Sequence, residues 1–156
     1  MIKINLVCVG NLKERFYVDA FNEYLKRLKK FCDIRTTEIE ESLLSKSGSF
    51  DIEKILETEG VKILKSLKGT VIVLDILGKK IDSIGFSTLL NENIKSGNEI
   101  TFVIGGSHGI SKSVKDKAHL KLSFSDMTFP HMLMRIILTE QIYRGFCIIN
   151  NSPYHK

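Results

Sequence analysis

The segment ITFVIGGSHG, residues 100–109, indicates most clearly how this chain folds. Its first half is apolar apart from Thr101, as expected for a strand that is covered on both faces in a parallel sheet. The glycines that follow let the backbone approach a ligand closely and leave N–H groups exposed. A second apolar run, TVIVL at Thr70–Leu74, has the same character as the first. The two segments predict buried strands of a parallel sheet.

Strand-like and helix-like segments alternate outward from these two runs. Further strands are expected at Ile2–Val9, Ile34–Ile39 and Leu120–Phe124. Helices are expected at Glu14–Phe31, from a cap at Asp51 to Lys68, from Asp82 or Ser83 to about Gly97, from about Ser111, and from Pro130 to Arg144, with a loop over 41–50. This order predicts an α/β fold in which helices cover both faces of a parallel sheet. No repeat or linker divides the chain, so residues 1–156 are expected to form a single domain.

The ends of the predicted strands indicate where a ligand would bind. In open parallel sheets, ligands bind outside the carboxyl ends of the strands. In this chain those ends fall at Leu74–Asp75, Gly105–Gly109 and Ser123–Thr128. We therefore expect the chemistry of this protein to lie in these three loops.

Composition and charge restrict the class of protein. The net charge is +5, and residues 101–156 hold seven basic against three acidic side chains, which favours an anionic partner such as RNA. No apolar run reaches the roughly 18 residues of a membrane span, and the N-terminus reads as a strand and not as an export signal, so a cytoplasmic protein is expected. Cys8, Cys32 and Cys147 form no CxxC pair, so we expect neither a metal site nor a disulfide. Cys8 and Cys147 stand in apolar stretches and are expected to be buried thiols.

The glycine-rich loop also matches GxSxG, the pattern around the nucleophile of serine hydrolases, with Ser107 at its centre. Asp126 and either His131 or His155 follow in the chain order that such hydrolases use. Against this reading, the chain is short for an α/β-hydrolase, and no HGGG-like segment for an oxyanion hole precedes the loop. A serine hydrolase stays an alternative at this point.

Polar pairs on the last predicted helix are further candidates. His131 and Arg135 share one helix face, and they sit beside the predicted ligand loops. Glu140 and Arg144 form a second pair at the same spacing, which by itself predicts an ordinary exposed ion pair. The terminal PYHK, residues 153–156, is either a frayed end or a contact for a base and a phosphate.

Together these residues make the chain resemble, along nearly its whole length, the small bacterial SPOUT methyltransferases that modify N3 of a pseudouridine in large-subunit ribosomal RNA. The matching features, in chain order, are Val9-Gly10-Asn11-Leu12-Lys13, Leu74-Asp75 with Gly78-Lys79, Phe102–Gly109, Leu122–His131, Glu140-Gln141-Ile142-Tyr143-Arg144 and Tyr154-His155-Lys156. Each feature alone is a weak signal, but their order and spacing make the combination specific. One departure is Asp82-Ser83-Ile84, where the family usually has Ser-Ser-Glu, so any role of a glutamate there is absent.

The resemblance implies a homodimer and a trefoil knot near the C-terminus, in which the last helix passes through a loop. It also implies a pocket for S-adenosylmethionine (SAM) at the three loops, lined by Leu74, Gly105, Phe124, Ser125, Asp126, Met127, Thr128 and Phe129. Small and apolar residues suit an adenine ring and a methionine chain. Much of the contact to SAM is expected through backbone groups.

The activity that the resemblance implies is methyl transfer from SAM to N3 of a pseudouridine, without a metal ion. The ring nitrogen must lose a proton, and the enzyme must align it with the methyl group and exclude water. Candidates for contact with the base are His131, Arg135, Arg144, Tyr154 and His155. An arginine can stabilise negative charge on the base oxygens, and His155 is a candidate proton acceptor.

A non-catalytic RNA-binding or ribosome-associated protein is a second alternative, since the net charge and the basic tail would suit it. That alternative leaves the three ligand loops unexplained, whereas a methyltransferase accounts for both features. A small domain with one modest basic region is poorly equipped to read a long RNA site alone. The assembled ribosome is therefore the expected substrate.

Overall fold

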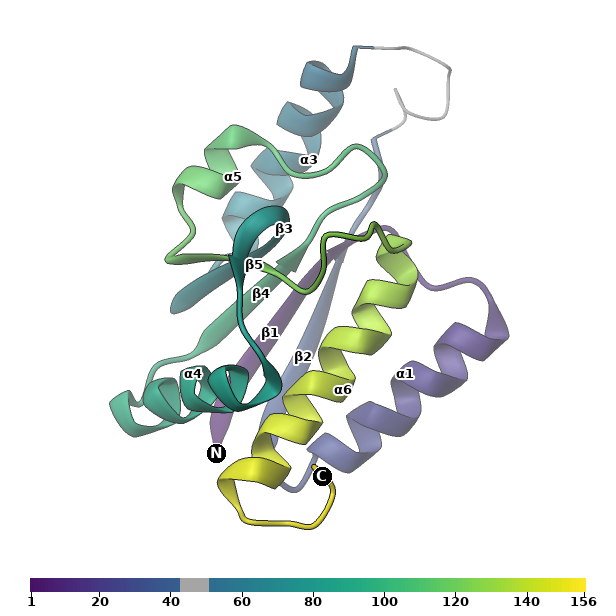
Figure 1. Ribbon diagram of the computed structural model, residues 1–156. Coiled ribbons are helices and arrows are strands. Elements are labelled where there is room, and N and C mark those ends of the chain that lie inside the picture. The colour runs from purple at the N-terminus through teal and green to yellow at the C-terminus, as the bar shows by residue number, and fades with distance from the viewer. Residues whose placement is uncertain (43–50) are drawn as a thin grey trace.

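The computed structural model describes residues 1–42 and 51–156, and most of the loop expected over 41–50 lies outside the described residues. Strands and helices alternate along the chain as predicted (Figure 1). The strands are β1 (Ile2–Val9), β2 (Cys32–Ile39), β3 (Thr70–Lys80), β4 (Ile100–Ile104) and β5 (Leu120–Ser123). The helices are α1 (Arg15–Leu28), α3 (Ile52–Ser66), α4 (Ser83–Ser96), α5 (Lys112–Asp116) and α6 (His131–Ile149).

The strands of the described residues lie parallel in one sheet, in the order β2-β1-β4-β3-β5. β4 occupies the centre, where Phe102 is paired with Leu6 of β1 and with Ile72 of β3. Every residue of β4 is buried, which confirms that this apolar run is a strand covered on both faces. The predicted α/β fold with a parallel sheet is thereby confirmed.

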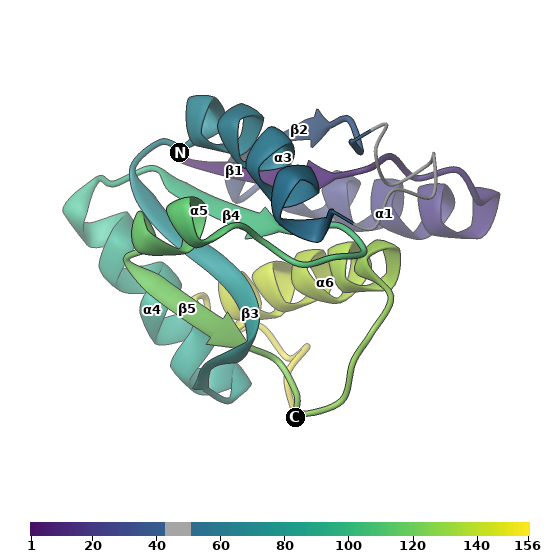
Figure 2. The ribbon, with the colours of Figure 1, turned by 90° about the horizontal axis from the view of Figure 1, so that it is seen from above.

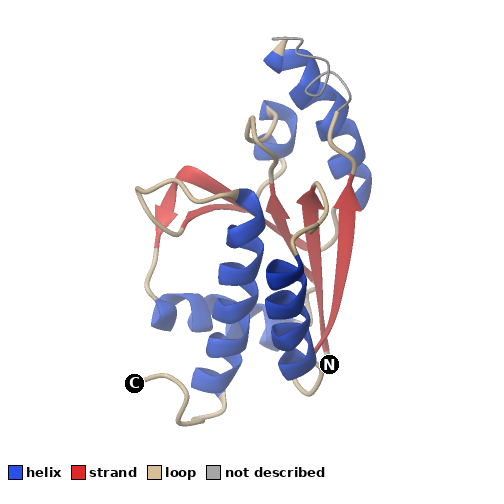
Figure 3. Ribbon diagram, turned by 90° about the vertical axis from the view of Figure 1, so that its right-hand side faces the viewer, coloured by secondary structure: helices blue, strands red, loops and turns tan. Residues whose placement is uncertain are grey.

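Helices cover both faces of the sheet (Figure 2). α1, α4 and α6 lie on one face and pack against the even-numbered side chains of β1, such as Leu6. α3 and α5 lie on the opposite face and pack against the odd-numbered ones, such as Val7, because successive side chains of a strand point to opposite faces. Figure 3 shows α1 and α6 side by side in front of the sheet. Within the described part of the chain, no helix combines the length and the apolar character needed to cross a membrane.

β3 is longer than predicted. The sequence indicated a strand that ends at Leu74, whereas the structure continues it to Lys80. Leu74 and Lys79 both pair with Leu122 of β5, so residues 75–78 leave the sheet between them as a bulge. The last two residues of β3, Lys79 and Lys80, are polar. They belong to the sheet because they pair with β5, and not because the sequence of this segment has a strand-like pattern.

The other differences lie at the ends of elements. α6 ends at Ile149 and not at Arg144, because the added residues, among them Phe146, continue into the core. α1 ends at Leu28 and not at Phe31, whose ring instead stacks on Phe146 with 5.3 Å between centroids. For β2, β5 and α3, the predicted bounds differ from the observed ones by one or two residues.

Side-chain caps begin three of the helices at the predicted positions. Asp51, Asp82 and Ser111 each accept a hydrogen bond from the backbone N–H three residues later, at 3.1, 2.7 and 3.4 Å. Gly97 follows α4 with a φ of +68°, a conformation that glycine adopts without strain. Short-range signals therefore determine where α3, α4 and α5 begin.

The three cysteines are buried, as predicted for Cys8 and Cys147, with exposed fractions of 1% for Cys8, 2% for Cys32 and 1% for Cys147. Burial raises the pKa of Cys8 to about 11 and that of Cys32 to about 12. Because the thiolate is the reactive form, we expect iodoacetamide at about pH 8 to leave the native protein unmodified. Intact-mass spectrometry should find three adducts once the chain is unfolded in guanidinium. Rapid alkylation of the native protein would contradict this burial.

Candidate active site

The bulge within β3 and the loops after β4 and β5 meet at the carboxyl edge of the sheet and enclose a cleft of about 760 Å³. The lining comes from the bulge after Leu74, from the glycine-rich loop that begins at Gly105, and from residues 128–131, together with Met134 of α6. Parallel strands place their carboxyl ends at one edge, which is why segments far apart in sequence converge here. The predicted convergence of the three loops is confirmed.

A smaller cavity of about 150 Å³ shares part of the wall of this cleft. The predicted cofactor residues that line one or both cavities are Leu74, Gly105, Phe124, Ser125, Met127, Thr128 and Phe129. Asp126 is placed differently, because its exposed carboxylate pairs with the ammonium group of Lys80. The side chain of Asp126 therefore faces solvent, although its loop forms part of the wall.

Hydrogen bonds within the loop after β5 hold its shape. The hydroxyl of Ser123 donates to the carbonyl oxygen of Ser125 (3.1 Å), and the hydroxyl of Ser125 accepts from the N–H of Met127 (3.0 Å). The Phe124 ring packs edge-on against Phe86 of α4, with 6.1 Å between centroids. The oxygen of the Ser125 hydroxyl is thus used as an acceptor inside the loop.

The bulge after Leu74 carries an ion pair that the sequence did not single out. Oδ1 of Asp75 accepts a hydrogen bond from the N–H of Leu77 (3.1 Å), and Oδ2 lies 3.0 Å from Nζ of Lys115. Burial opposes ionisation of Asp75, but this hydrogen bond and the Lys115 ammonium outweigh it and lower the pKa of the carboxyl group. Asp75 stands at a predicted strand end, whereas no local pattern points to Lys115. Both line the cleft and place fixed charges on its wall.

His131 and Arg135 lie on one face of the first turns of α6, as their spacing predicted, and this face is turned toward the carboxyl ends of β1 and β2. His131 lines the cleft, and its Nε2 lies 3.6 Å from Oε1 of Glu41. Arg135 is only 1% exposed: Nη1 donates to Oε1 of Glu38 (2.6 Å), and Nη2 donates to the carbonyl oxygen of Gly10 (3.0 Å). Arg135 is therefore a buried side chain that links α6 to Glu38 of β2 and to Gly10 after β1.

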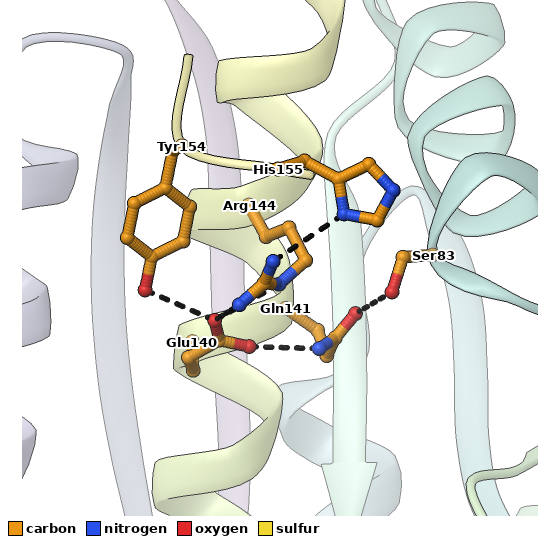
Figure 4. Close-up of polar contacts among 6 residues, drawn as sticks. All are labelled: Ser83, Glu140, Gln141, Arg144, Tyr154 and His155. Carbon is orange, nitrogen blue, oxygen red and sulfur yellow. Dashed lines mark hydrogen bonds and ion pairs between the residues drawn. The ribbon is translucent and has the colours of Figure 1, made fainter. Parts of the chain in front are cut away.

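A second polar group lies toward the other end of α6, where the C-terminal tail folds back on the helix (Figure 4). Oε1 of Glu140 accepts hydrogen bonds from Nη2 (2.6 Å) and Nε (3.0 Å) of Arg144 and from the hydroxyl of Tyr154 (3.1 Å). Burial and the Glu140 carboxylate raise the pKa of Tyr154 to about 12, and the same carboxylate raises the pKa of Arg144. The side chains of Glu140 and Arg144 are 17% and 25% exposed. The prediction of an ordinary exposed ion pair is therefore wrong, because Tyr154 of the tail joins the pair.

The ring of His155 completes this group. Nη1 of Arg144 lies 3.3 Å from Nδ1 of His155. A guanidinium group has donors only, so this hydrogen bond needs an unprotonated Nδ1, and a neutral ring then carries its proton on Nε2. In this arrangement His155 offers an N–H donor, and it can accept a proton only after Nδ1 releases Arg144.

A single chain does not unite the five predicted catalytic residues. Nine positions separate Arg135 from Arg144, which at a rise of about 1.5 Å per residue is about 13 Å along α6. Figures 1 and 3 place the C-terminal tail near the start of the strands, away from the loops that follow them. His131 and Arg135 therefore lie near the cleft, whereas Arg144, Tyr154 and His155 lie toward the opposite end of the molecule.

Comparison with known proteins identifies the family to which this arrangement belongs. A family model described as "Predicted SPOUT methyltransferase" matches residues 2–155. The chain belongs to the SPOUT methyltransferase family. It is 41% identical over 157 residues to ribosomal RNA large subunit methyltransferase H of Malacoplasma penetrans (strain HF-2), covering 99% of this chain and 100% of the relative. A protein of the same name from Caldicellulosiruptor saccharolyticus is 45% identical over 155 residues, covering 98% and 99%.

A solved structure agrees with this SPOUT methyltransferase in fold. The "probable methylase family protein" from Haemophilus influenzae Rd KW20 aligns with a TM-score of 0.60 at 13% sequence identity. The alignment covers 95% of this chain and 66% of that one. Likeness at such low identity supports the fold alone, and the methyltransferase prediction is confirmed by the family and not by this structure.

The geometry around Ser107 of the SPOUT methyltransferase differs from that of a serine hydrolase. Ser107 lies in a tight turn that a bridge between Gly106 and Gly109 closes, and not at an elbow between a strand and a helix. Asp126 pairs with Lys80 at the surface. Nδ1 of His155 is engaged by an arginine. Asp126 and His155 are thus committed to other partners, and His131 lies beside Glu41 and not beside Asp126, so the hydrolase alternative finds no support.

Proposed function

We propose that this SPOUT methyltransferase transfers the methyl group of SAM to N3 of a pseudouridine in large-subunit ribosomal RNA, with the assembled ribosome as its substrate. The observation that carries the proposal is the full-length identity of 41% and 45% to relatives named ribosomal RNA large subunit methyltransferase H. The basic excess of residues 101–156 suits a polyanionic substrate. A cytoplasmic location is part of the same proposal.

The cleft at the carboxyl edge of the sheet is the proposed SAM site. Its volume of about 760 Å³ falls in the range of roughly 300–1,000 Å³ that is common for ligand pockets. Leu74, Phe129 and Met134 supply apolar walls, and the backbone of Gly105 forms part of the lining. SAM supplies an activated methyl group, so the residues of the cleft need only bind, align and exclude water.

Arg144 and His155 are the proposed contacts to the target base, and Tyr154 is proposed to hold the tail that carries His155. When N3 loses its proton, negative charge spreads to the two flanking carbonyl oxygens of the base. The guanidinium of Arg144 and the Nε2–H of His155 are donors suited to that charge, and the hydroxyl of Tyr154 keeps the tail folded against Glu140. While Arg144 holds Nδ1 of His155, the proton of N3 must pass to another acceptor.

A homodimer is part of the proposal, because within one chain the C-terminal tail lies far from the cleft that is proposed to bind SAM. In a homodimer the tail of one subunit becomes available to the cleft of the other. Leu77 and Met127, which border the two cavities, are 88% and 74% exposed in the single chain, and an interface would cover them. We also propose the trefoil knot, in keeping with the path of the chain from the edge strand β5 back to α6, which packs against α1 and α4.

Ribosomes from cells that lack the corresponding gene provide the test. Incubated with the purified protein and methyl-labelled SAM, they should take up label in large-subunit RNA, and digestion with mass spectrometry should locate the label at a pseudouridine. Protein-free RNA should accept less label than whole ribosomes. If the protein binds SAM but no RNA is labelled, the proposed SAM site stands and the proposed substrate is wrong. Absence of both would contradict the proposal as a whole.

A further inference from the structure

One side chain of α4 joins the polar group on α6 (Figure 4). The hydroxyl of Ser83 donates to Oε1 of Gln141 (2.8 Å), and Nε2 of Gln141 donates to Oε2 of Glu140 (2.7 Å). Since an ionised carboxylate only accepts hydrogen bonds, Glu140 determines which end of the Gln141 amide faces it. The amide oxygen then faces Ser83, whose hydroxyl supplies the matching donor. The three side chains form a hydrogen-bonded chain that runs in one direction.

This hydrogen-bonded chain restricts the orientation of the Glu140 carboxylate. Oε1 holds Arg144 and Tyr154, whereas Oε2 is held by Gln141. The last torsion of a glutamate has a broad distribution, so hydrogen bonds to both oxygens are needed to select one orientation. Without Gln141, Oε1 is free to turn away from Arg144 and from the tail.

The first turn of α4 also contacts the loop proposed to bind SAM. Phe86 lies one turn after Ser83 and is buried, and its ring meets Phe124 edge-on. A cavity of about 310 Å³ between α4 and α6 has Ser83, Phe124 and Gln141 in its lining. The same turn of α4 therefore touches both the SAM loop and the hydrogen-bonded chain that leads to Arg144.

We propose that Ser83 and Gln141 are positioning residues for methyl transfer, which fix the Glu140 carboxylate and through it Arg144 and the C-terminal tail. The proposal rests on the proposed function, because it assigns a role within that reaction. Both residues lie outside the lining of the cleft. Their loss should therefore lower turnover, by reducing the fraction of molecules in which the tail is correctly held, without weakening the binding of SAM.

Ser83→Ala and Gln141→Leu test this role by separating rate from binding. Gln141→Leu should lower kcat for ribosome methylation about tenfold and Ser83→Ala about threefold, below the roughly 100-fold cost of full misplacement. Calorimetry should find the Kd for SAM within about twofold of the wild-type value in both. Thr88→Ala is the matched control on α4, because the exposed hydroxyl of Thr88 donates to the Ile84 carbonyl of the same helix (3.1 Å). It should keep the wild-type kcat, and thermal unfolding verifies that all three variants fold.

Gln141→Glu adds a readout that a purely structural role would not move. Its new carboxylate faces Glu140, and two adjacent carboxylates retain a shared proton more readily than both ionise. At low pH the shared proton replaces the lost N–H donor, whereas at higher pH repulsion turns Glu140 away. The kcat of Gln141→Glu relative to wild type should therefore fall as the pH rises. Among the described residues, the other ionisable side chains around this site include Tyr143, Arg144, Tyr154, His155, Tyr24, Arg27 and Asp82.

Nitrogen-15 NMR of the histidine rings gives a readout that needs no substrate. Wild-type His155 should show the Nε2–H tautomer that Arg144 selects, and Gln141→Leu should shift it toward a mixture, with His155→Ala used to assign the signal. If wild-type protein labels no ribosomes and this shift still occurs, the positioning role stands and the proposed substrate is wrong. If the ribosome is methylated and neither kcat nor the tautomer changes in Ser83→Ala and Gln141→Leu, the positioning role is overturned.

Discussion

Replacing Arg144 with alanine is expected to lower kcat for ribosome methylation about 100- to 1,000-fold while the Kd for SAM stays within about twofold. Loss of the N3 proton places negative charge on the base oxygens, and the Arg144 guanidinium is a donor held in place by two hydrogen bonds to Glu140. Arg144 lies outside the lining of the cleft, so its removal leaves the SAM site intact. The expected result is therefore a large fall in kcat with an almost unchanged Kd for SAM.

Two further variants make the Arg144→Ala comparison specific. Arg144→Lys keeps the charge but cannot donate twice to Oε1 of Glu140, so an intermediate rate is expected. Arg35→Ala removes an exposed arginine that pairs with Asp33 on β2, and it should leave the rate unchanged. His155→Ala should show the same separation of rate from binding as Arg144→Ala. Label incorporation gives kcat and calorimetry gives Kd, and an equal loss of both in Arg144→Ala would exclude a role at the base.

The centre of the fold could be predicted because its signals are short-range. ITFVI is apolar enough to show a strand buried on both faces, and every residue of β4 is buried. Asp51, Asp82 and Ser111 cap helices through a contact three residues away, which a sequence pattern can reveal. The meeting of the three loops then followed from the parallel order of the strands.

The second half of β3 could not be predicted, because it is a strand only through its pairing with β5. Residues 75–78 leave the sheet, and Lys79 and Lys80 rejoin β5 at Leu122 and Ser123. These strand residues show neither a continuous apolar run nor a clear alternation, and they pair with a strand much later in the chain. Non-local pairing of this kind leaves little trace in the segment that undergoes it.

The candidate catalytic residues were predicted as one group, and the structure divides them. Arg135 is a basic residue on a helix, yet it is buried against Glu38. Tyr154 reaches Glu140 across 14 positions of the chain. Helical spacing identified Glu140 and Arg144 as a pair, but it could not reveal their environment. Burial and the path of the tail depend on how α6 packs, which no local pattern contains.

Gly105→Ala is expected to raise the Kd for SAM at least about tenfold, equivalent to about 1.4 kcal/mol, and to lower methyl transfer with it. A methyl group on Gly105 would lie 2.6 Å from the carbonyl oxygen of Gly109 and 2.6 Å from Cγ1 of Ile110. Contacts this short force a neighbour to move. Because the Gly109 carbonyl belongs to the backbone of the same loop, the loop itself has to shift, and it forms one wall of the cleft.

Gly97→Asn is the matched control for Gly105→Ala. Gly97 ends α4 with a φ of +68° and open space around it, and asparagine tolerates that conformation. Calorimetry and thermal unfolding of both variants separate a local change in the cleft from a general loss of stability. Gly105 lines the cleft and Arg144 does not, so Gly105→Ala should lose affinity and rate together, whereas Arg144→Ala should lose rate alone. If Gly105→Ala bound SAM as tightly as wild type, the cofactor would have to sit elsewhere, even if the ribosome were still methylated.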